Sequence, residues 1–209
     1  MPLFQQYIQP AGRWGIWKTD ETPEELLAML PHREKYRQDM QRFAAEHRRL
    51  EWLAVRVLLY ILLGEEKEIA YYPTGKPYLV DASASISISH TKGYVAVALG
   101  APTAEVGIDI EQYGERVQKV AHKFMREDEL PASYRGTETW SLLLHWSAKE
   151  TMFKCMNASE VDFRKHLHIL PFTIGERGVF SAEEYRTAEK RIFTVSYLLG
   201  SDFVLTLCL

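Results

Sequence analysis

Residues 84–99 read ASISISHTKGYVAVAL, and this stretch decides the fold. Apolar and small residues alternate on both sides of Lys92-Gly93, and this period of two is typical of a β-hairpin with a glycine turn. A similar stretch, VSYLLGSDFVLTL, occupies residues 195–207. The recurrence predicts an α+β fold of two similar α/β lobes in a pseudo-twofold arrangement, with the functional site in the cleft between them.

The two hairpins place the lobe boundary near Ala101-Pro102, which gives an N-terminal lobe of residues 1–102 and a C-terminal lobe of residues 103–209. Thr22-Pro23 is typical of a helix start and Gly64 of a helix end. Apolar spacing leaves open whether the helical segment before Gly64 is one long helix or two with a break. The patterns predict strands at 12–18, at 105–111 and within 166–208, and helices at 23–30, 33–63, 115–130 and 137–156.

The composition of the 209 residues is that of an ordinary globular protein, with 46% hydrophobic and 25% charged residues. A formal net charge of −3 argues against bulk electrostatic binding of nucleic acid. Neither a signal peptide nor an apolar run of the ~18 residues that span a bilayer is evident. Cys155 and Cys208 suggest no disulfide framework and no metal-ligand pair. We therefore expect a cytoplasmic monomer with no nucleic-acid or membrane partner.

Asp109 and Glu111, in the stretch GIDIE (107–111), are the first candidate site residues. On a strand, residues i and i+2 point to the same face, with their Cα atoms ~6.6–6.8 Å apart. Two carboxylates held in this way repel each other unless a cation lies between them, and a hard divalent ion such as Mg²⁺ suits oxygen ligands. The alternative is an exposed strand face with two solvated acids.

The second candidate group lies in WSAKETMFK (146–154), on a predicted helix. Glu150 and Lys154 are spaced i,i+4, which also suits an ordinary surface ion pair worth ~0.2–0.5 kcal/mol. The helix is apolar around much of its circumference, so a charged pair there favours a cleft wall. Glu150 would then complete a three-carboxylate site with Asp109 and Glu111, and Lys154 would meet an anionic substrate.

Further side chains suit phosphate, although each is otherwise an ordinary structural or solvated residue. Ser89-His90 ends the first hairpin strand, and Gly75-Lys76-Pro77 presents a lysine on a turn. Residues 33–56 hold seven Arg or Lys against four Asp or Glu. A basic series recurs there every seven residues and shares one face if the helix is continuous: Lys35, Arg42, Arg49 and Arg56.

In order and spacing, TGKP (74–77), SISISHTKGYVAVAL (85–99), GIDIE and WSAKETMFK closely resemble the 4′-phosphopantetheinyl transferases, in particular the longer surfactin-synthetase-activating (Sfp-like) class. The resemblance spans about residues 33–156 and implies the two-lobed fold of that family. It also implies Mg²⁺-dependent transfer of the 4′-phosphopantetheine arm of coenzyme A, the co-substrate, to a serine of an apo acyl, peptidyl or polyketide carrier protein. The implied second product is 3′,5′-adenosine bisphosphate.

The resemblance also implies roles for single residues. Asp109, Glu111 and Glu150 would bind Mg²⁺, and Glu150 and Lys154 would be catalytic. The resemblance implies Lys35 and Arg48 at the 3′-phosphate of coenzyme A, with Arg49 or Arg56 as alternatives, and Lys154 and Lys149 at the pyrophosphate. It also implies that Lys76 and His90 bind coenzyme A phosphates, with Ser89 offering its backbone.

In the implied reaction the carrier serine attacks the β-phosphorus of coenzyme A. Glu150 would accept the serine proton, directly or through water, and Lys154 would stabilise charge on the leaving phosphate. Two other functions would use part of the same residues: a Mg²⁺-dependent phosphohydrolase or nuclease, and a non-catalytic carrier-protein-binding module. The first usually needs more acids to hold two metal ions, and the second would be expected to have lost one of the three acids.

Residues 116–126 are interpreted as the surface on which the carrier docks. The four cations of this stretch are spaced for one helical face, opposite apolar residues that can pack into the lobe. The resemblance implies an acidic carrier, which a positively charged helix face would attract. The alternative is an ordinary solvent-exposed basic face that binds no partner. The four cations are Arg116, Lys119, Lys123 and Arg126.

Overall fold

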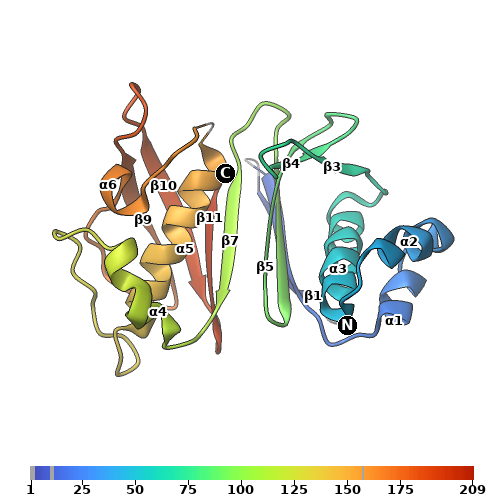
Figure 1. The fold of residues 1–209 in the computed structure, drawn as a ribbon, viewed down its shortest axis with the longest axis horizontal. Coiled ribbons are helices and arrows are strands. Elements are labelled where there is room, and N and C mark those ends of the chain that lie inside the picture. Colours follow the sequence, from blue (N-terminus) through green and yellow to red (C-terminus); the bar gives the residue numbers. More distant parts are fainter. Residues whose placement is uncertain (1–2, 10–11, 157) are drawn as a thin grey trace. The chain divides into compact units, whose positions relative to one another are not determined.

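A computed structural model describes residues 3–9, 12–156 and 158–209 (Figure 1). The chain divides into two compact units, one ending at Ala104 but including Leu209, and the other spanning Glu105–Cys208. Each unit combines an antiparallel sheet with helices, which confirms a mixed α/β fold. The pseudo-twofold relation between the lobes stays a prediction. Among the described residues, no helix has both the length and the apolar character needed to cross a membrane.

The first unit contains a four-stranded sheet in the order β1-β2-β6-β5 and a separate two-stranded sheet, β3-β4. Helix α3 packs on β2 and β6, and α1 packs on α3. The elements are β1 (Leu3–Gln9), β2 (Gly12–Lys18), α1 (Pro23–Ala28), α2 (Arg33–Asp39), the 3-10 turn η1 (Met40–Arg42), α3 (Glu46–Leu63), β3 (Ile69–Tyr71), β4 (Pro77–Leu79), β5 (Ser85–Thr91) and β6 (Tyr94–Gly100).

The sequence signals for helix ends in this unit are confirmed. Thr22 and Glu25 form a capping box at the start of α1, in which the Thr22 hydroxyl accepts from the Glu25 amide and the Glu25 carboxylate accepts from the Thr22 amide. Gly64 ends α3 with a φ of +78°, and its amide donates to the Tyr60 carbonyl at 2.7 Å. The helical region before Gly64 is broken between α2 and α3, so its heptad-spaced cations do not lie along one continuous helix.

The hairpin predicted at 84–99 is formed by β5 and β6. Its turn residue Gly93 has a φ of +80°, which explains why glycine follows Lys92. Every residue of β6 is buried, and Val95 and Val97 belong to the same apolar cluster as Leu53 and Val57 of α3. The sheet is therefore held to α3 by burial of aliphatic side chains.

The second unit is a five-stranded antiparallel sheet in the order β7-β11-β10-β9-β8, with α5 packed on β7 and β11. The sheet confirms the strand-rich character predicted for 166–208, including the final hairpin. The elements are β7 (Gly107–Gln112), α4 (Arg116–Val120), the 3-10 turn η2 (Ala121–Lys123), α5 (Thr139–Cys155), α6 (Phe163–His166), β8 (Leu167–Ile169), β9 (Arg177–Glu184), β10 (Ile192–Leu199) and β11 (Phe203–Cys208).

The helix predicted at 115–130 is much shorter than expected, because only α4 and η2 are helical there. After η2 the amides of Phe124 and Met125 still donate to the Ala121 carbonyl, but other backbone groups of the segment bond to side chains. The Phe124 carbonyl accepts from the Lys149 ammonium at 2.6 Å, and the Arg126 amide donates to the Glu129 carboxylate at 2.8 Å. Tertiary contacts have therefore replaced the local helical preference.

Helix α5 packs closely on the sheet. Three buried hydroxyls join them, since Thr206 Oγ1 on β11 lies 2.8 Å from Ser147 Oγ and 2.7 Å from Thr151 Oγ1 on α5. At Gly107 on β7, a Cβ atom would lie only 2.3 Å from the Thr151 carbonyl oxygen. Glycine at this position lets the helix approach the strand that carries Asp109.

Replacing Gly107 with alanine should destabilise the protein, because the added methyl group meets helix backbone that cannot move aside cheaply. We expect a loss of about 1–3 kcal/mol or more in the free energy of unfolding, measured by urea denaturation. Gly114→Ala is the matched control, since a Cβ there has no neighbour within 4 Å. Equal urea midpoints for the two variants would contradict the close approach.

Candidate functional site

Strand β7 and helix α5 bring four of the predicted residues into one group in the second unit. Lys154 Nζ donates to Asp109 Oδ1 at 2.8 Å and to the Ile108 carbonyl at 2.9 Å. Trp146 Nε1 donates to Glu111 Oε1 at 2.7 Å. Asp109 and Glu111 thus both contact α5, as their i and i+2 positions on one strand face require. Lys154 is paired with Asp109 across the two elements, so the group is more than a pair on the helix surface.

The three carboxylates affect one another through charge and burial. Asp109 is buried, and Glu111 and Glu150 are half-buried. Loss of solvation, followed by the charge of Asp109, raises the pKa of Glu111 to about 7 even though the Trp146 hydrogen bond opposes the shift. The same two causes raise the pKa of Glu150 to about 6. Both carboxyl groups are harder to ionise than usual, and a cation beside them would stabilise their ionised forms.

The donor set fits Mg²⁺ chemically, because all three candidates offer carboxylate oxygens, which hard divalent ions prefer. Within residues 3–9, 12–156 and 158–209, no three or more His, Cys, Asp or Glu side chains are gathered closely enough to hold a metal ion as they stand. The carboxylates would therefore have to draw together around an ion. In the present arrangement the positive charge next to Asp109 is the ammonium group of Lys154.

Lys149 does not belong to this group, which corrects the expectation that it contacts the pyrophosphate of coenzyme A. Its side chain has no exposed surface. Its ammonium group donates to Glu129 Oε2 at 2.7 Å and to the Phe124 carbonyl at 2.6 Å. A fully buried cation with two internal acceptors has no surface with which to meet a ligand.

The first unit contains a second group of candidates, around a cavity of about 320 Å³. Arg48 and His90 line it, and both lie near Glu51, with Arg48 Nη1 at 3.3 Å and His90 Nδ1 at 3.5 Å from its Oε2 atom. The full lining is Arg42, Phe43, Arg48, Glu51, Trp52, Val55, Arg56, Tyr71, Ile88 and His90. The cavity thus combines several cations with aromatic surface.

Sequence reasoning missed the stacking of two arginines on Trp52, which lines this cavity. The guanidinium carbon of Arg56 lies 3.5 Å from the centroid of the Trp52 ring, and that of Arg42 lies 5.3 Å from it. Burial lowers the pKa of Arg56 to about 10, which still leaves it charged at neutral pH. The available signal was the spacing of Trp52 and Arg56, four residues apart and so neighbours on one helix face.

The other candidates for coenzyme A phosphates lie outside the residues that line the cavity. Lys35, on α2, is exposed, and its Nζ lies 3.9 Å from Glu68 Oε2. Arg49 donates from Nε to the Phe43 carbonyl. Lys76 is half-buried in the turn before β4, and Ser89 is buried in β5 next to His90. Of the basic residues named for the 3′-phosphate, Arg48 and Arg56 are therefore the two that the cavity brings together.

The basic stretch 116–126 is only partly as predicted. Arg116, Lys119 and Lys123 are exposed, while Val117 and Phe124 are buried in the core of the unit. Arg126 differs from the other three cations because its guanidinium group pairs with Asp128 at 2.9 Å. Within residues 116–126, the exposed cations without a described ion pair therefore lie on α4 and η2.

Comparison with known proteins gives a family for the second unit. Residues 105–208 match the family model of the 4′-phosphopantetheinyl transferase superfamily. The matched residues include β7 and α5, and therefore every member of the carboxylate group. The match indicates a transferase that moves phosphopantetheine. No curated protein matches the chain.

The raised pKa of Glu111 predicts a pH-dependent cost to folding when no metal ion is present. Below its unfolded pKa of 4.5 the group is protonated in both states, and as pH rises toward its folded pKa of about 7 the folded state loses stability. In chelating buffer, Glu111→Gln should therefore stabilise the protein by about 1–3 kcal/mol at pH 8 and by nearly nothing at pH 4.5.

Thermal or urea unfolding at the two pH values measures this difference. Glu115→Gln is the control, because Glu115 is exposed just before α4. A Glu111→Gln variant that loses stability at pH 8 relative to the parent would contradict the electrostatic account of the site.

Proposed function

We propose that this chain is a 4′-phosphopantetheinyl transferase of the Sfp-like class. It transfers the arm of coenzyme A to a serine of an apo carrier protein and releases 3′,5′-adenosine bisphosphate, in a reaction that depends on Mg²⁺. One observation carries the proposal: Asp109, Glu111, Glu150 and Lys154 form one group within the segment that matches the superfamily.

Asp109, Glu111 and Glu150 would hold the ion. When bound, Mg²⁺ neutralises negative charge on the pyrophosphate of coenzyme A. The partly buried setting of the three carboxylates strengthens their attraction for a cation, since charges interact more strongly where water is scarce. It also explains why Glu111 and Glu150 have raised pKa values without one.

The bond changes require a base and a group that accepts negative charge. The serine oxygen of the carrier forms a bond to the β-phosphorus while the bond from that phosphorus to the oxygen bridging to the α-phosphate breaks. Glu150 would accept the serine proton, directly or through water. The ammonium group of Lys154, next to Asp109, stabilises the charge on the departing bisphosphate.

The cavity of the first unit is proposed to bind the 3′-phosphate end of coenzyme A. Arg48 is exposed at its edge, so an incoming phosphate would compete with Glu51 for the guanidinium group. The imidazole of His90 lies near the same Glu51 carboxylate and offers a second hydrogen-bond donor to the phosphate. Arg56 and Arg42, stacked on Trp52, add positive charge to the wall. The exposed cations Arg116, Lys119 and Lys123 on the second unit are proposed to attract an acidic carrier.

The transfer itself is tested by incubating candidate apo-carriers with the protein, coenzyme A and Mg²⁺. Mass spectrometry should show addition of phosphopantetheine to the carrier, and Asp109→Ala should reduce the rate about a thousandfold or more. Circular dichroism controls for folding of the variant. Release of adenosine bisphosphate without a carrier would favour a phosphohydrolase, and near-normal transfer by Asp109→Ala would remove Asp109 from the metal site.

The role of the cavity is tested by Arg48→Ala. Because Arg48 would hold a phosphate remote from the reacting bond, its loss should raise the KM for coenzyme A about tenfold while kcat changes little. The variant should also discriminate less against 3′-dephospho-coenzyme A. Arg49→Ala is the matched control, since Arg49 is next in the sequence but is not among the residues that line the cavity, and its Nε donates to the Phe43 carbonyl. Identical kinetics of the two variants would contradict the assignment.

A further inference from the structure

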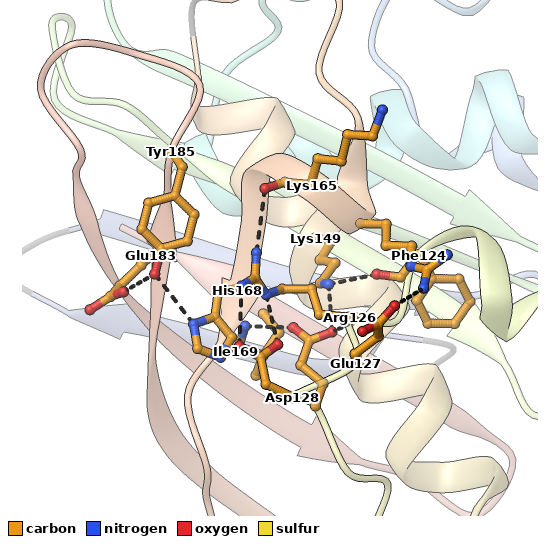
Figure 2. A network of polar contacts seen from close by, with 12 residues as sticks. Phe124, Arg126, Glu127, Asp128, Lys149, Lys165, His168, Ile169, Glu183 and Tyr185 are labelled. Carbon is orange, nitrogen blue, oxygen red and sulfur yellow. Dashed lines mark hydrogen bonds and ion pairs between the residues drawn. The ribbon is translucent and has the colours of Figure 1, made fainter.

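Lys149 and Glu129 form an ion pair in which neither side chain has any exposed surface, with 2.7 Å between Nζ and Oε2. Glu129 also accepts from two amides, that of Arg126 at Oε2 and that of Ile169 at Oε1, at 2.8 and 2.7 Å. The three donors to Glu129 belong to Lys149, Arg126 and Ile169, which are labelled in Figure 2. The pair therefore joins α5 to β8 and to the segment that follows η2.

Buried charges are costly to desolvate, and a pair of this kind adds little stability compared with apolar side chains of similar size. The main effect of such a pair is to fix the positions of the segments that carry it. A movement that separated the two charges would leave each of them unpaired in the interior, at a high cost in free energy. The Lys149–Glu129 pair thus fixes where the segment after η2 lies relative to α5.

The second hydrogen bond of Lys149 extends this constraint toward Glu111. Lys149 Nζ donates to the carbonyl of Phe124 at 2.6 Å (Figure 2). The Phe124 ring is buried and meets the Trp146 ring edge-on, with 5.3 Å between ring centroids and an interplanar angle of 60°. Fixing the Phe124 backbone thus fixes the wall against which the Trp146 indole packs.

Trp146 is the last link, since its indole N–H donates to Glu111 Oε1 at 2.7 Å. The indole is a rigid donor, so its position determines where this carboxylate oxygen is held. Phe163 packs on Trp146 as well, with 5.6 Å between centroids. A continuous series of contacts thus runs from the buried ion pair through Phe124 and Trp146 to a proposed metal ligand.

We propose that the Lys149–Glu129 pair positions Glu111 for Mg²⁺ through Phe124 and Trp146. Lys149 is then a positioning residue and not a catalytic one, although it directly precedes Glu150. The inference rests on the proposed function for the identity of the ion. Residues that orient a metal ligand commonly change metal affinity 10- to 100-fold when they are removed.

The test measures Mg²⁺ binding by calorimetry in the absence of coenzyme A and carrier. Lys149→Met combined with Glu129→Gln removes both charges together and avoids a lone buried ion. This double variant should weaken Mg²⁺ binding about tenfold, as should Trp146→Phe. The triple variant should bind no more weakly than Trp146→Phe alone, because both changes act through one contact. Arg126→Gln is the control and should bind like the parent, because it removes the guanidinium contacts with Asp128, the Lys165 carbonyl and the Tyr185 ring but keeps the backbone amide that donates to Glu129.

A second readout needs no metal ion. In chelating buffer, hydrogen exchange of the Trp146 indole N–H should be about tenfold or more faster in the double variant, whereas amides in the middle of α5 stay protected. If the double variant fails to fold, Phe124→Leu takes its place, because it removes the ring contact and keeps the ion pair. Phe124→Leu should then weaken Mg²⁺ binding and speed indole exchange.

Unchanged Mg²⁺ affinity and unchanged indole exchange in a folded variant would overturn the positioning role while leaving the proposed function intact. Additive losses in the triple variant would also overturn it, because they would show that the pair acts by another route. A parent protein that binds no Mg²⁺ would overturn the proposed metal site and this inference together.

Discussion

The close packing of α5 on β7 is the constraint on which the second unit depends. Gly107 permits it, since any side chain there would collide with the Thr151 carbonyl. The packing brings Asp109 against Lys154 and Glu111 against Trp146. Acids on a strand and on a helix thereby share one half-buried place, where they repel one another and attract cations.

Two lysines of α5, five residues apart, each neutralise one carboxylate, but in different surroundings. Lys154 lies at the edge of the carboxylate group, partly exposed, and balances Asp109 while remaining able to meet an anion. Lys149 is enclosed and balances Glu129, which holds the neighbouring segment in place. Lys154 is placed to contact a substrate anion, and Lys149 is placed to hold the neighbouring segment against α5. The proposed transferase needs both, because positioned charges are effective only when their supports are fixed.

Much of this arrangement was predictable from the sequence, and the rest has identifiable physical reasons. Strand alternation predicted the hairpins and the shared face of Asp109 and Glu111, because side chains on a strand repeat every two residues. The cavity around Trp52 was missed because it depends on how the break between α2 and α3 folds the chain. The burial of Lys149 was also missed, since its partner Glu129 lies twenty residues earlier in a segment that was expected to be helical.

The central claim is that Asp109, Glu111 and Glu150 form one carboxylate site that a divalent cation completes. Calorimetric titration of Mg²⁺ at pH 6.5, repeated in buffers with different ionisation enthalpies, counts the protons released on binding. Because the pKa values of Glu111 and Glu150 are about 7 and about 6, binding should release protons at pH 6.5 and far fewer at pH 8.5. Absence of binding, or binding with no proton release at either pH, would contradict the account.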